Sequence, residues 1–360
     1  MSLDSYVSLG RSGLRVSPLT LGTMTFGEDH GWGASVEESE VILAEYLDRG
    51  GNCIDTANIY TNGHSEKIIG DWFAARPELR DRVVIGTKFF ANLFEGDPNG
   101  GGAGRKSIVA ALENSLRRLR TDYIDIYWLH NWDRTAPIEE TLRTLDDLVT
   151  AGKIRYVGFS DLPAWKAAEA QVTARLRGWA PAIGLQVEYS LLERTSEGEL
   201  MPMAQEHGLG VMPWSPLKSG FLSGKYSRRR PGSIDTLRGG LVGGPSEKDY
   251  DVIDVLEHVA QEAGVTPAAA ALAWVRQQPG VTSTLIGARR VDQFRANLAS
   301  LDVHLTDAQL ATLNEVSEPA LNFPAENNRL LAPSLAFAGA TVDGVRTSVL
   351  PLLTANSARY

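Results

Sequence analysis

Asn52-Cys53-Ile54-Asp55-Thr56-Ala57-Asn58-Ile59-Tyr60 is the stretch from which the fold of the chain can be worked out. A short apolar run ends there in an aspartate, and a tyrosine follows. Two later apolar runs, residues 83–87 and 124–129, end directly before Lys88 and His130. Each run is expected to be a buried strand, and in parallel α/β proteins the loops that leave the C-terminal ends of the strands converge on one face. We therefore predict one shared pocket for Asp55, Tyr60, Lys88 and His130.

The composition is that of a globular protein: 360 residues, of which 43% are hydrophobic and 22% charged. The net charge of −9 argues against nucleic acid or an anionic membrane as a partner. No apolar run is long enough for a membrane span, and the first residues lack the pattern of a signal peptide. Cys53 is the only cysteine, which excludes an internal disulfide and predicts a cytoplasmic protein. Its apolar neighbours predict a buried side chain and not a nucleophile.

Apolar runs compatible with strands recur eight times, most of them followed by a segment with helical periodicity: residues 19–24, 52–55, 83–87, 124–129, 154–159, 183–187, 210–212 and 284–286. This alternation predicts an α/β fold with a parallel sheet inside a layer of helices, and eight repeats close a (β/α)8 TIM barrel. The alternative is a doubly wound open sheet, which would carry a G-x-G-x-x-G turn after its first strand. Residues 22–27 lack that spacing.

The barrel is expected to occupy residues 1–317 as one domain, with a hairpin at residues 6–16 before the first strand. Residues 318–360 show no clear period, and we expect an irregular C-terminal extension that lies over the barrel or is partly disordered. Five glycines make residues 89–104 a candidate for a mobile loop that covers substrate. Arg228-Arg229-Arg230, within the irregular segment 216–247, is expected to be a solvated run. The histidines show no metal-ligand spacing, so no metal site is predicted.

The four polar residues at the strand ends point to chemistry when they are taken together. Singly, each has an ordinary structural explanation, such as a loop cap or a core aromatic, but lysine and aspartate are rarely buried unless paired. An Asp55–Lys88 ion pair is expected to lower the pKa of the Tyr60 phenol from about 10, which would make it a proton donor. His130 would orient a substrate oxygen or assist the proton transfer. Such a site suits reduction of a carbonyl, provided that another group supplies hydride.

These motifs together resemble those of the aldo-keto reductases, over roughly residues 6–317. The matching features are Asp55-x4-Tyr60, the strand-end Lys88 and Trp128-Leu129-His130. Further matches are Gly158-Phe159-Ser160, Gln186-Val187-Glu188-Tyr189, Trp214-Ser215-Pro216-Leu217 with Gly220-Phe221-Leu222, and Ile286-Gly287-Ala288-Arg289 with Gln293 and Asn297. The pattern is similar to the broad bacterial and potassium-channel beta-subunit-like branch of the family.

The resemblance implies a role for each matching residue. Tyr60 would be the general acid, tuned by Lys88 and Asp55, and His130 would orient the substrate. The implied cofactor-binding residues are Gly22, Thr23, Met24 and Asp55; Ser160, Asp161, Gln186 and Trp214 at the nicotinamide; Ser215, Pro216, Leu217 and Gly220 at the pyrophosphate; and Gly287, Arg289, Gln293 and Asn297 at the adenosine end. Asp161 departs from the family, which usually has asparagine there, and an ionised aspartate cannot donate to the carboxamide oxygen.

The cofactor is expected to be NADP, because Arg289 and Arg290 directly precede a helix that begins near Val291. A small aldehyde or ketone, apolar or aromatic, is the expected substrate, and the oligomeric state stays open. The residues expected to line the substrate site are Trp32, Tyr60, Phe89, His130 and Trp132. Two alternatives remain. One is a dedicated ketoreductase for a sugar nucleotide or natural product, favoured by a basic pocket around residues 216–240. The other is a nicotinamide-binding subunit that senses redox state for a partner protein.

Overall fold

The computed structural model describes residues 1–228 and 244–353, and its centre is a parallel sheet of eight strands. The strands follow the order β10-β3-β4-β5-β6-β7-β8-β9. Their bounds are β3 Leu19–Gly22, β4 Cys53–Asp55, β5 Val84–Phe89, β6 Ile124–Leu129, β7 Ile154–Ser160, β8 Ala182–Glu188, β9 Gly210–Trp214 and β10 Thr284–Ile286. A parallel bridge between Val211 and Val281 nearly closes the barrel on its last side. All eight predicted strands and the (β/α)8 barrel are confirmed.

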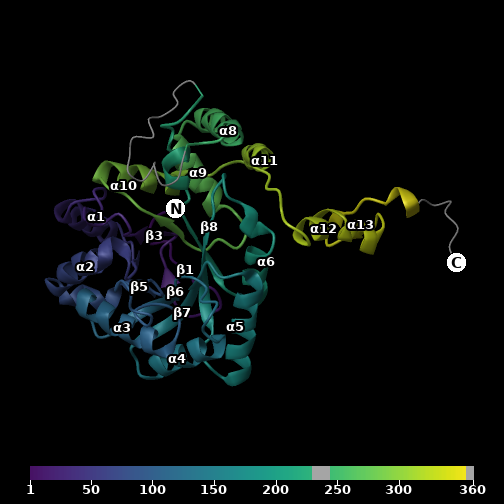
Figure 1. Cartoon of the computed structure of the whole chain (residues 1–360). Helices are drawn as coiled ribbons and strands as arrows, with labels where there is room; N and C mark the ends of the chain where they lie inside the picture. Colours follow the sequence, from purple (N-terminus) through teal and green to yellow (C-terminus); the bar gives the residue numbers. More distant parts are fainter. Residues whose placement is uncertain (229–243, 354–360) are drawn as a thin grey trace.

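Helices surround the sheet on the outside, as Figure 1 shows in a view close to the barrel axis. The helices of this layer are α1 Val36–Asp48, α2 His64–Ala74, α3 Arg105–Leu119, α4 Ile138–Thr150, α5 Ala164–Arg177, α6 Leu200–His207, α8 Glu247–Ala263, α9 Pro267–Arg276, α10 Val291–Leu298 and α11 Asp307–Val316. Ser35 caps α1 by accepting from the Glu38 amide at 3.2 Å, as expected for a serine before an acidic first turn. No helix of the described residues is long and apolar enough to cross a membrane.

The half of the barrel interior at the N-terminal ends of the strands is apolar and closed. Trp128 of β6 fills it, and glycines on β5, β7 and β8, namely Gly86, Gly158 and Gly184, leave room for its indole, since a Cβ on any of them would lie within 3 Å of the ring. The predicted N-terminal hairpin is present as β1 Val7–Ser8 and β2 Arg15–Val16, which pair antiparallel. Its Leu9 and Val16 pack into the same cluster as Trp128, so the hairpin seals this end.

Cys53 also lies in this sealed half of the barrel. Its side chain is buried in the cluster with Trp128, and burial raises the pKa of its thiol to about 12. The thiol therefore stays protonated and unreactive at neutral pH, as the sequence predicted.

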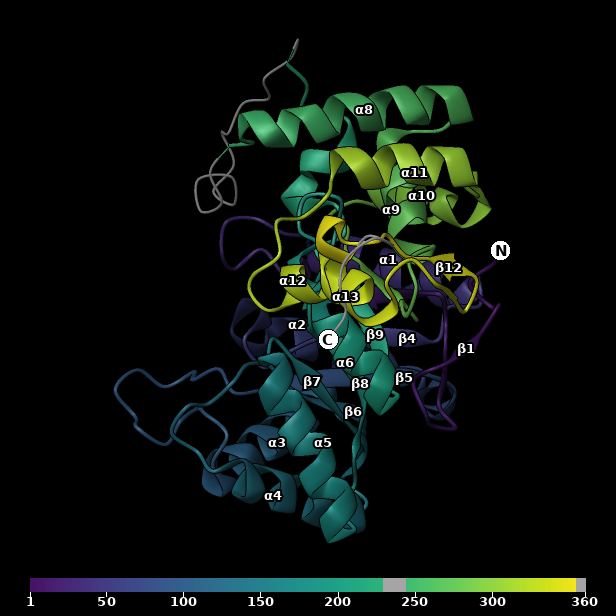
Figure 2. The same cartoon turned by 90° about the vertical axis from the view of Figure 1, so that its right-hand side faces the viewer.

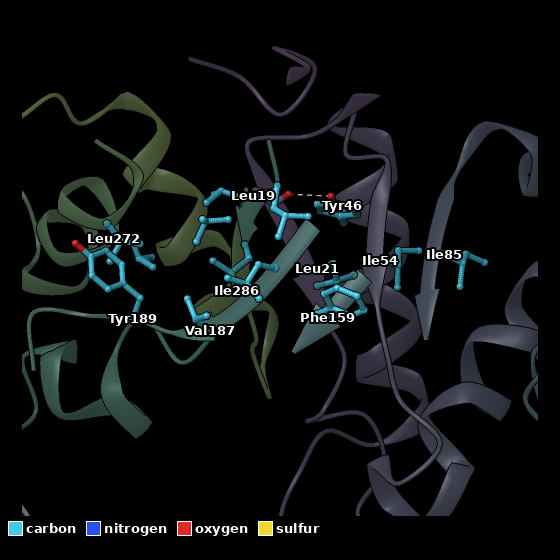
Figure 3. Packing of buried hydrophobic residues seen from close by; sticks show 14 of the residues in the cluster. Leu19, Leu21, Tyr46, Ile54, Ile85, Phe159, Val187, Tyr189, Leu272 and Ile286 are labelled. Carbon is cyan, nitrogen blue, oxygen red and sulfur yellow. Dashed lines mark hydrogen bonds between the residues drawn. The ribbon is translucent and has the colours of Figure 1, made fainter. Parts of the chain in front are cut away.

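The main core lies between the sheet and the helices (Figure 3). Side chains that alternate with the barrel-lining ones, such as Leu21, Ile54, Ile85 and Phe159, point into this layer. Tyr46 of α1 ties the layer to the sheet, because its hydroxyl donates to the Leu19 carbonyl at 2.9 Å and accepts from the Cys53 amide at 3.1 Å. This packing fixes the orientation of the strands and therefore the positions of the side chains at their ends.

The C-terminal extension, which was expected to be irregular and either to lie over the barrel or to be partly disordered, includes short regular elements between residues 325 and 353. It contains α12 Ala325–Leu330, α13 Ala332–Phe337 and a hairpin of β11 Thr341–Val342 with β12 Val345–Arg346. Figures 1 and 2 show that it stands out beside α6 and α11, away from the barrel. Many of its apolar side chains are consequently exposed, including Phe323, Leu330, Leu335, Phe337, Val345 and Leu352.

Two further predictions concerned loops. The segment 90–104 is irregular, as expected, but it is held by its own hydrogen bonds, including Asn92 Nδ2 to the Asp97 carbonyl at 2.7 Å. Arg228 is not simply solvated, because it forms ion pairs with Glu247, Asp251 and Asp254 of α8. The rest of the predicted arginine run, and residues 229–240 of the candidate basic pocket at 216–240, lie outside the described residues.

Candidate active site

The structure brings Asp55, Tyr60, Lys88 and His130 together at the C-terminal end of the barrel. Lys88 comes from β5 and is buried inside the barrel, where its ammonium group donates to the Asp55 carboxylate at the end of β4. The same nitrogen lies 2.9 Å from the Tyr60 hydroxyl and 3.0 Å from the Thr56 carbonyl. The Gln186 amide donates to the other Asp55 oxygen at 2.7 Å. Asp55 is therefore held between a cation and an amide.

Tyr60 is positioned by an irregular turn that follows β4. Its amide donates to the Ala57 carbonyl at 3.2 Å, and the next two residues, Thr61 and Asn62, have φ of 45° and 55°. Such left-handed conformations are uncommon outside glycine and mark a locally constrained backbone. The Thr61 hydroxyl anchors the turn by donating to the Phe26 carbonyl at 2.9 Å. The sequence had no pattern from which this anchoring could be predicted.

The pKa of Tyr60 does not follow the prediction. Burial raises it above its ordinary value of 10, and the Asp55 charge acts in the same direction, while Lys88 lowers it without prevailing. The prediction counted the lysine and missed the desolvation of the phenolate. Lys88 stays protonated, because Asp55 and Tyr60 raise its pKa more than burial lowers it. The site thus holds a neutral phenol beside an ammonium group.

His130 faces Tyr60 as a neutral imidazole. The two rings meet edge to face, with centroids 6.1 Å apart and an interplanar angle of 81°. Burial and the nearby Lys88 lower the pKa of His130 to about 3, so the ring is uncharged at neutral pH. One ring nitrogen can then donate a hydrogen bond to a substrate oxygen without carrying a charge.

The residues predicted at the nicotinamide lie beside this tetrad, at the ends of β7, β8 and β9. Ser160 and Gln186 are buried, and Trp214 is half-buried. The Trp214 indole Nε1 donates to Asp161 Oδ1 at 3.1 Å. The Gln186 amide nitrogen uses one of its two N–H groups on Asp55, so its carbonyl oxygen and its second N–H are the groups left for a ligand. An indole face next to amide and hydroxyl groups fits a planar carboxamide-bearing ring.

The residues predicted at the pyrophosphate form a tight turn after β9. Ser215 and Ser219 have φ of 53° and 55°, and Gly220 has φ of 97°. The turn is closed by its own amides, such as Lys218 to the Ser215 carbonyl at 2.8 Å. Pro216 is buried, while Ser215 and Leu217 are half-buried. Lys218, which sequence reasoning did not single out, pairs with Glu188 at 2.8 Å.

The residues predicted at the adenosine end lie in the loop after β10 and in α10. Asn297 Nδ2 donates to the Gly287 carbonyl at 3.2 Å, and Gln293 Oε1 accepts from the Arg289 amide at 3.2 Å. Arg290 is engaged with Asp292 at 2.9 Å, whereas the half-buried Arg289 guanidinium forms no ion pair with the described residues. The first α10 amide, that of Val291, already donates to Glu38 at 2.6 Å. A phosphate at this end would depend mainly on Arg289.

The residues predicted after β3 differ in their surroundings. Gly22 pairs with Asp55 across the sheet. Thr23 is buried, and its hydroxyl donates to the Asp55 carbonyl at 3.0 Å, so it supports the end of β4 that carries Asp55. Met24 is 43% exposed. The Asp55 side chain is itself buried, so a ligand would contact the neighbours of Asp55 and not its carboxylate directly.

Phe89 does not line the substrate site, and its prediction was wrong. It follows Lys88 in β5, and successive side chains in a strand point to opposite faces. Lys88 points into the barrel, so Phe89 points outwards, where it is fully buried against Tyr127 with ring centroids 4.7 Å apart. Trp32 and Trp132 are half-buried in loops at the barrel mouth. Trp165, which sequence reasoning missed, packs edge to face on Trp132 at 5.3 Å and is 58% exposed.

Phe89→Ala is expected to lower the free energy of unfolding by about 3–5 kcal/mol, because it opens a cavity in the helix layer. The KM for an aromatic aldehyde should stay within about twofold, since the ring does not reach the mouth. Urea unfolding followed by circular dichroism, and steady-state kinetics, measure the two quantities. Trp132→Ala is the matched comparison and should raise KM with little loss of stability. A raised KM in Phe89→Ala at unchanged stability would contradict the core position.

Comparisons with known proteins agree with this arrangement. A family model described as the aldo/keto reductase family matches residues 18–318. The uncharacterized oxidoreductase YrpG of Bacillus subtilis is 38% identical over 86% of this chain and 95% of its own length. A norsolorinic acid reductase of Emericella nidulans is 35% identical over 87% of this chain and 81% of its own length. An aryl-alcohol dehydrogenase [NADP(+)] of Phanerodontia chrysosporium is 34% identical over 87% of this chain and 85% of its own length. With this match over most of the barrel, the chain is an oxidoreductase that belongs to the aldo/keto reductase family.

Proposed function

We propose that the protein reduces aromatic aldehydes or ketones to alcohols with NADPH, and that Tyr60 donates the proton. The contact that carries the proposal is the buried Lys88, which touches both the Asp55 carboxylate and the Tyr60 hydroxyl. A protonated phenol beside a fixed ammonium group is suited to deliver a proton to a developing alkoxide. Relatives named for aryl-alcohol and norsolorinic acid chemistry favour aromatic substrates.

Different residues of the chain orient a bound carbonyl group, donate the proton and stabilise the charge that remains. The bound nicotinamide cofactor would supply the hydride. His130, as a neutral donor, orients the carbonyl oxygen towards Tyr60, and the Tyr60 hydroxyl passes its proton to that oxygen. Lys88 stabilises the phenolate that remains, and Asp55 keeps Lys88 in place and charged. The raised pKa of Tyr60 keeps the donor protonated across the neutral range.

Trp214, Ser160 and Gln186 would hold the nicotinamide, and the turn from Ser215 to Gly220 would lie along the pyrophosphate. The tryptophans at the mouth, Trp32, Trp132 and Trp165, would contact an aromatic substrate. Indole rings provide large apolar contact surfaces for such groups. Arg289 would bind the 2′-phosphate, because its guanidinium is available while that of Arg290 is engaged with Asp292.

Arg289→Ala is expected to weaken NADPH binding by about tenfold or more, since one charge-assisted contact to the phosphate is lost. NADH, which lacks that phosphate, should bind the variant as it binds the wild type. Dissociation constants for both cofactors can be measured by calorimetry. Arg290→Ala, which removes the neighbouring guanidinium, is the control and should leave both constants nearly unchanged. An unchanged NADPH constant in Arg289→Ala would refute the assignment.

Oxidation of NADPH in the presence of 4-nitrobenzaldehyde, followed by absorbance, tests the proposed function directly. Turnover that depends on both the aldehyde and NADPH would support it. Tight NADPH binding without turnover on a panel of aromatic aldehydes and ketones would contradict it. That result would favour a dedicated ketoreductase or a redox-sensing subunit, which a search for a stable protein partner separates.

A further inference from the structure

Asp161 differs from the other carboxylates of the candidate active site, because it has no cation of its own. Asp55 pairs with Lys88, and Glu188 pairs with Lys218 at 2.8 Å, but Asp161 forms no ion pair among residues 1–228 and 244–353. Its hydrogen-bond partners are neutral groups, the Trp214 indole at 3.1 Å and the Ser160 hydroxyl. Its φ of 53° lies in the left-handed region, which asparagine and aspartate tolerate better than most residues.

The charged groups around Asp161 do not neutralise its carboxylate, so the ionised side chain adds one net negative charge to the site. Among charged side chains, Lys88 of β5 lowers the pKa of Asp161 and Glu188 of β8 raises it, while Tyr60 and His130 are neutral. The Asp55 carboxylate and the Lys88 ammonium group form a pair with no net charge. Burial raises the pKa of Asp161 to about 6, so the side chain is mainly ionised above neutrality and mainly protonated in mild acid.

We propose that the Asp161 carboxylate makes the site favour the oxidised nicotinamide cofactor over the reduced one. The inference rests on the proposed function, since it requires a nicotinamide ring beside Trp214. The oxidised ring is a cation and the reduced ring is neutral, so a fixed negative charge stabilises only the first. Asparagine has nearly the same shape and could still accept from the Trp214 indole, but it carries no charge.

This preference for the oxidised cofactor affects carbonyl reduction through the release of its product cofactor. The overall equilibrium between carbonyl and alcohol is unchanged, because a protein cannot alter it. The carboxylate instead holds the oxidised cofactor after carbonyl reduction, so product inhibition by NADP(+) is strong in the wild type. Asp161 is thus a specificity-determining residue for the redox state of the cofactor, in addition to its contact with Trp214.

The test compares wild type with Asp161→Asn through dissociation constants for NADP(+) and NADPH at pH 5 and pH 8. Calorimetry supplies these constants without turnover. At pH 8 the Asn variant should lower the ratio of the NADPH constant to the NADP(+) constant by about tenfold, the effect of one nearby charge on an equilibrium. At pH 5 the two proteins should nearly agree, because Asp161 is then protonated. The cofactor 2′-phosphate also titrates between these values, but it is present in both forms and largely cancels in the ratio.

Two further variants make the result specific. Asp161→Gly also removes the charge, and glycine readily adopts the positive φ of this position. It should lower the ratio of the NADPH constant to the NADP(+) constant as Asp161→Asn does. Agreement of the two variants excludes an effect of the new amide donor. Asp292→Asn removes an exposed carboxylate near the adenosine end and should leave the ratio unchanged.

The outcomes separate this inference from the proposed function. If the wild type binds both cofactor forms and Asp161→Asn gives the same ratio as the wild type at pH 8, the inference is refuted and the proposed function stands. If the wild type binds neither form, both are refuted. A lower ratio in Asn and Gly that disappears at pH 5 supports both.

Discussion

Tyr60→Phe is expected to reduce kcat for carbonyl reduction by about a thousandfold or more, because the variant keeps the ring and removes the only group that we assign as proton donor. NADPH binding should be nearly unchanged, since the hydroxyl contacts Lys88 and not the residues assigned to the cofactor. The loss should therefore appear in kcat and in kcat/KM to a similar extent. NADPH oxidation with 4-nitrobenzaldehyde measures the rate, and calorimetry measures the binding.

Tyr156→Phe provides the matched control. Tyr156 lies early in β7 and packs against the hairpin cluster at the closed end of the barrel, far along the strand from Ser160. Removal of its hydroxyl should leave the rate close to that of the wild type. If Tyr60→Phe kept most of the activity while it bound NADPH normally, another donor would have to be present and the assignment of Tyr60 would be wrong.

Lys88→Met is expected to lower the free energy of unfolding by about 3–5 kcal/mol and to remove most of the activity. The side chains of Lys88 and Asp55 are 1% and 3% exposed, so the substitution leaves a carboxylate buried without its cation. The pKa of Lys88 is raised above its ordinary value of 10.5. Its stabilising contribution is therefore complete below that value and is lost only as the pH rises through the higher folded pKa. Urea unfolding at neutral pH measures the difference.

A double variant, Lys88→Met with Asp55→Leu, separates stability from chemistry. Replacement of both charges by apolar groups should recover much of the lost stability, because no unpaired charge remains. Activity should stay low, since the phenolate of Tyr60 would have no cation beside it. A single Lys88→Met variant as stable as the wild type would show that Asp55 does not depend on the pair.

The fold could be predicted largely from the ends of the apolar runs. All eight strands lie where their sequences placed them, because a strand buried on both faces is apolar throughout and stands out from its neighbours. The same reasoning placed Asp55 and Lys88 together, since charged residues that end adjacent parallel strands must share one face. Their ion pair in the structure follows from this topology.

The errors had local physical causes. Phe89 was assigned to the substrate site by its position after Lys88, but alternation along β5 turns it to the opposite face. The pKa of Tyr60 was judged from one neighbour, whereas burial decides its direction. Trp165 was missed because its contact with Trp132 joins the first turn of α5 to the loop after β6, and no spacing in the sequence connects them.

The short helices of the C-terminal extension could not be predicted for a different reason. Its Ala- and Leu-rich sequence forms two short helices, α12 and α13, which were too brief to give a recognisable period. Its internal arrangement depends on contacts between residues distant in the sequence, such as the hydrogen bond between the Ser334 and Ser348 hydroxyls at 2.7 Å. Contacts of this kind are not visible in composition.

The sealed thiol of Cys53 gives the protein a practical property. Because this is the only sulfhydryl of the chain and it is buried and protonated, maleimide reagents have no natural target at neutral pH. A cysteine introduced at a chosen surface position could therefore be labelled alone, with no need to delete a native one first. Fluorophores or spin labels could then report on loop motion at the barrel mouth in an otherwise unaltered chain.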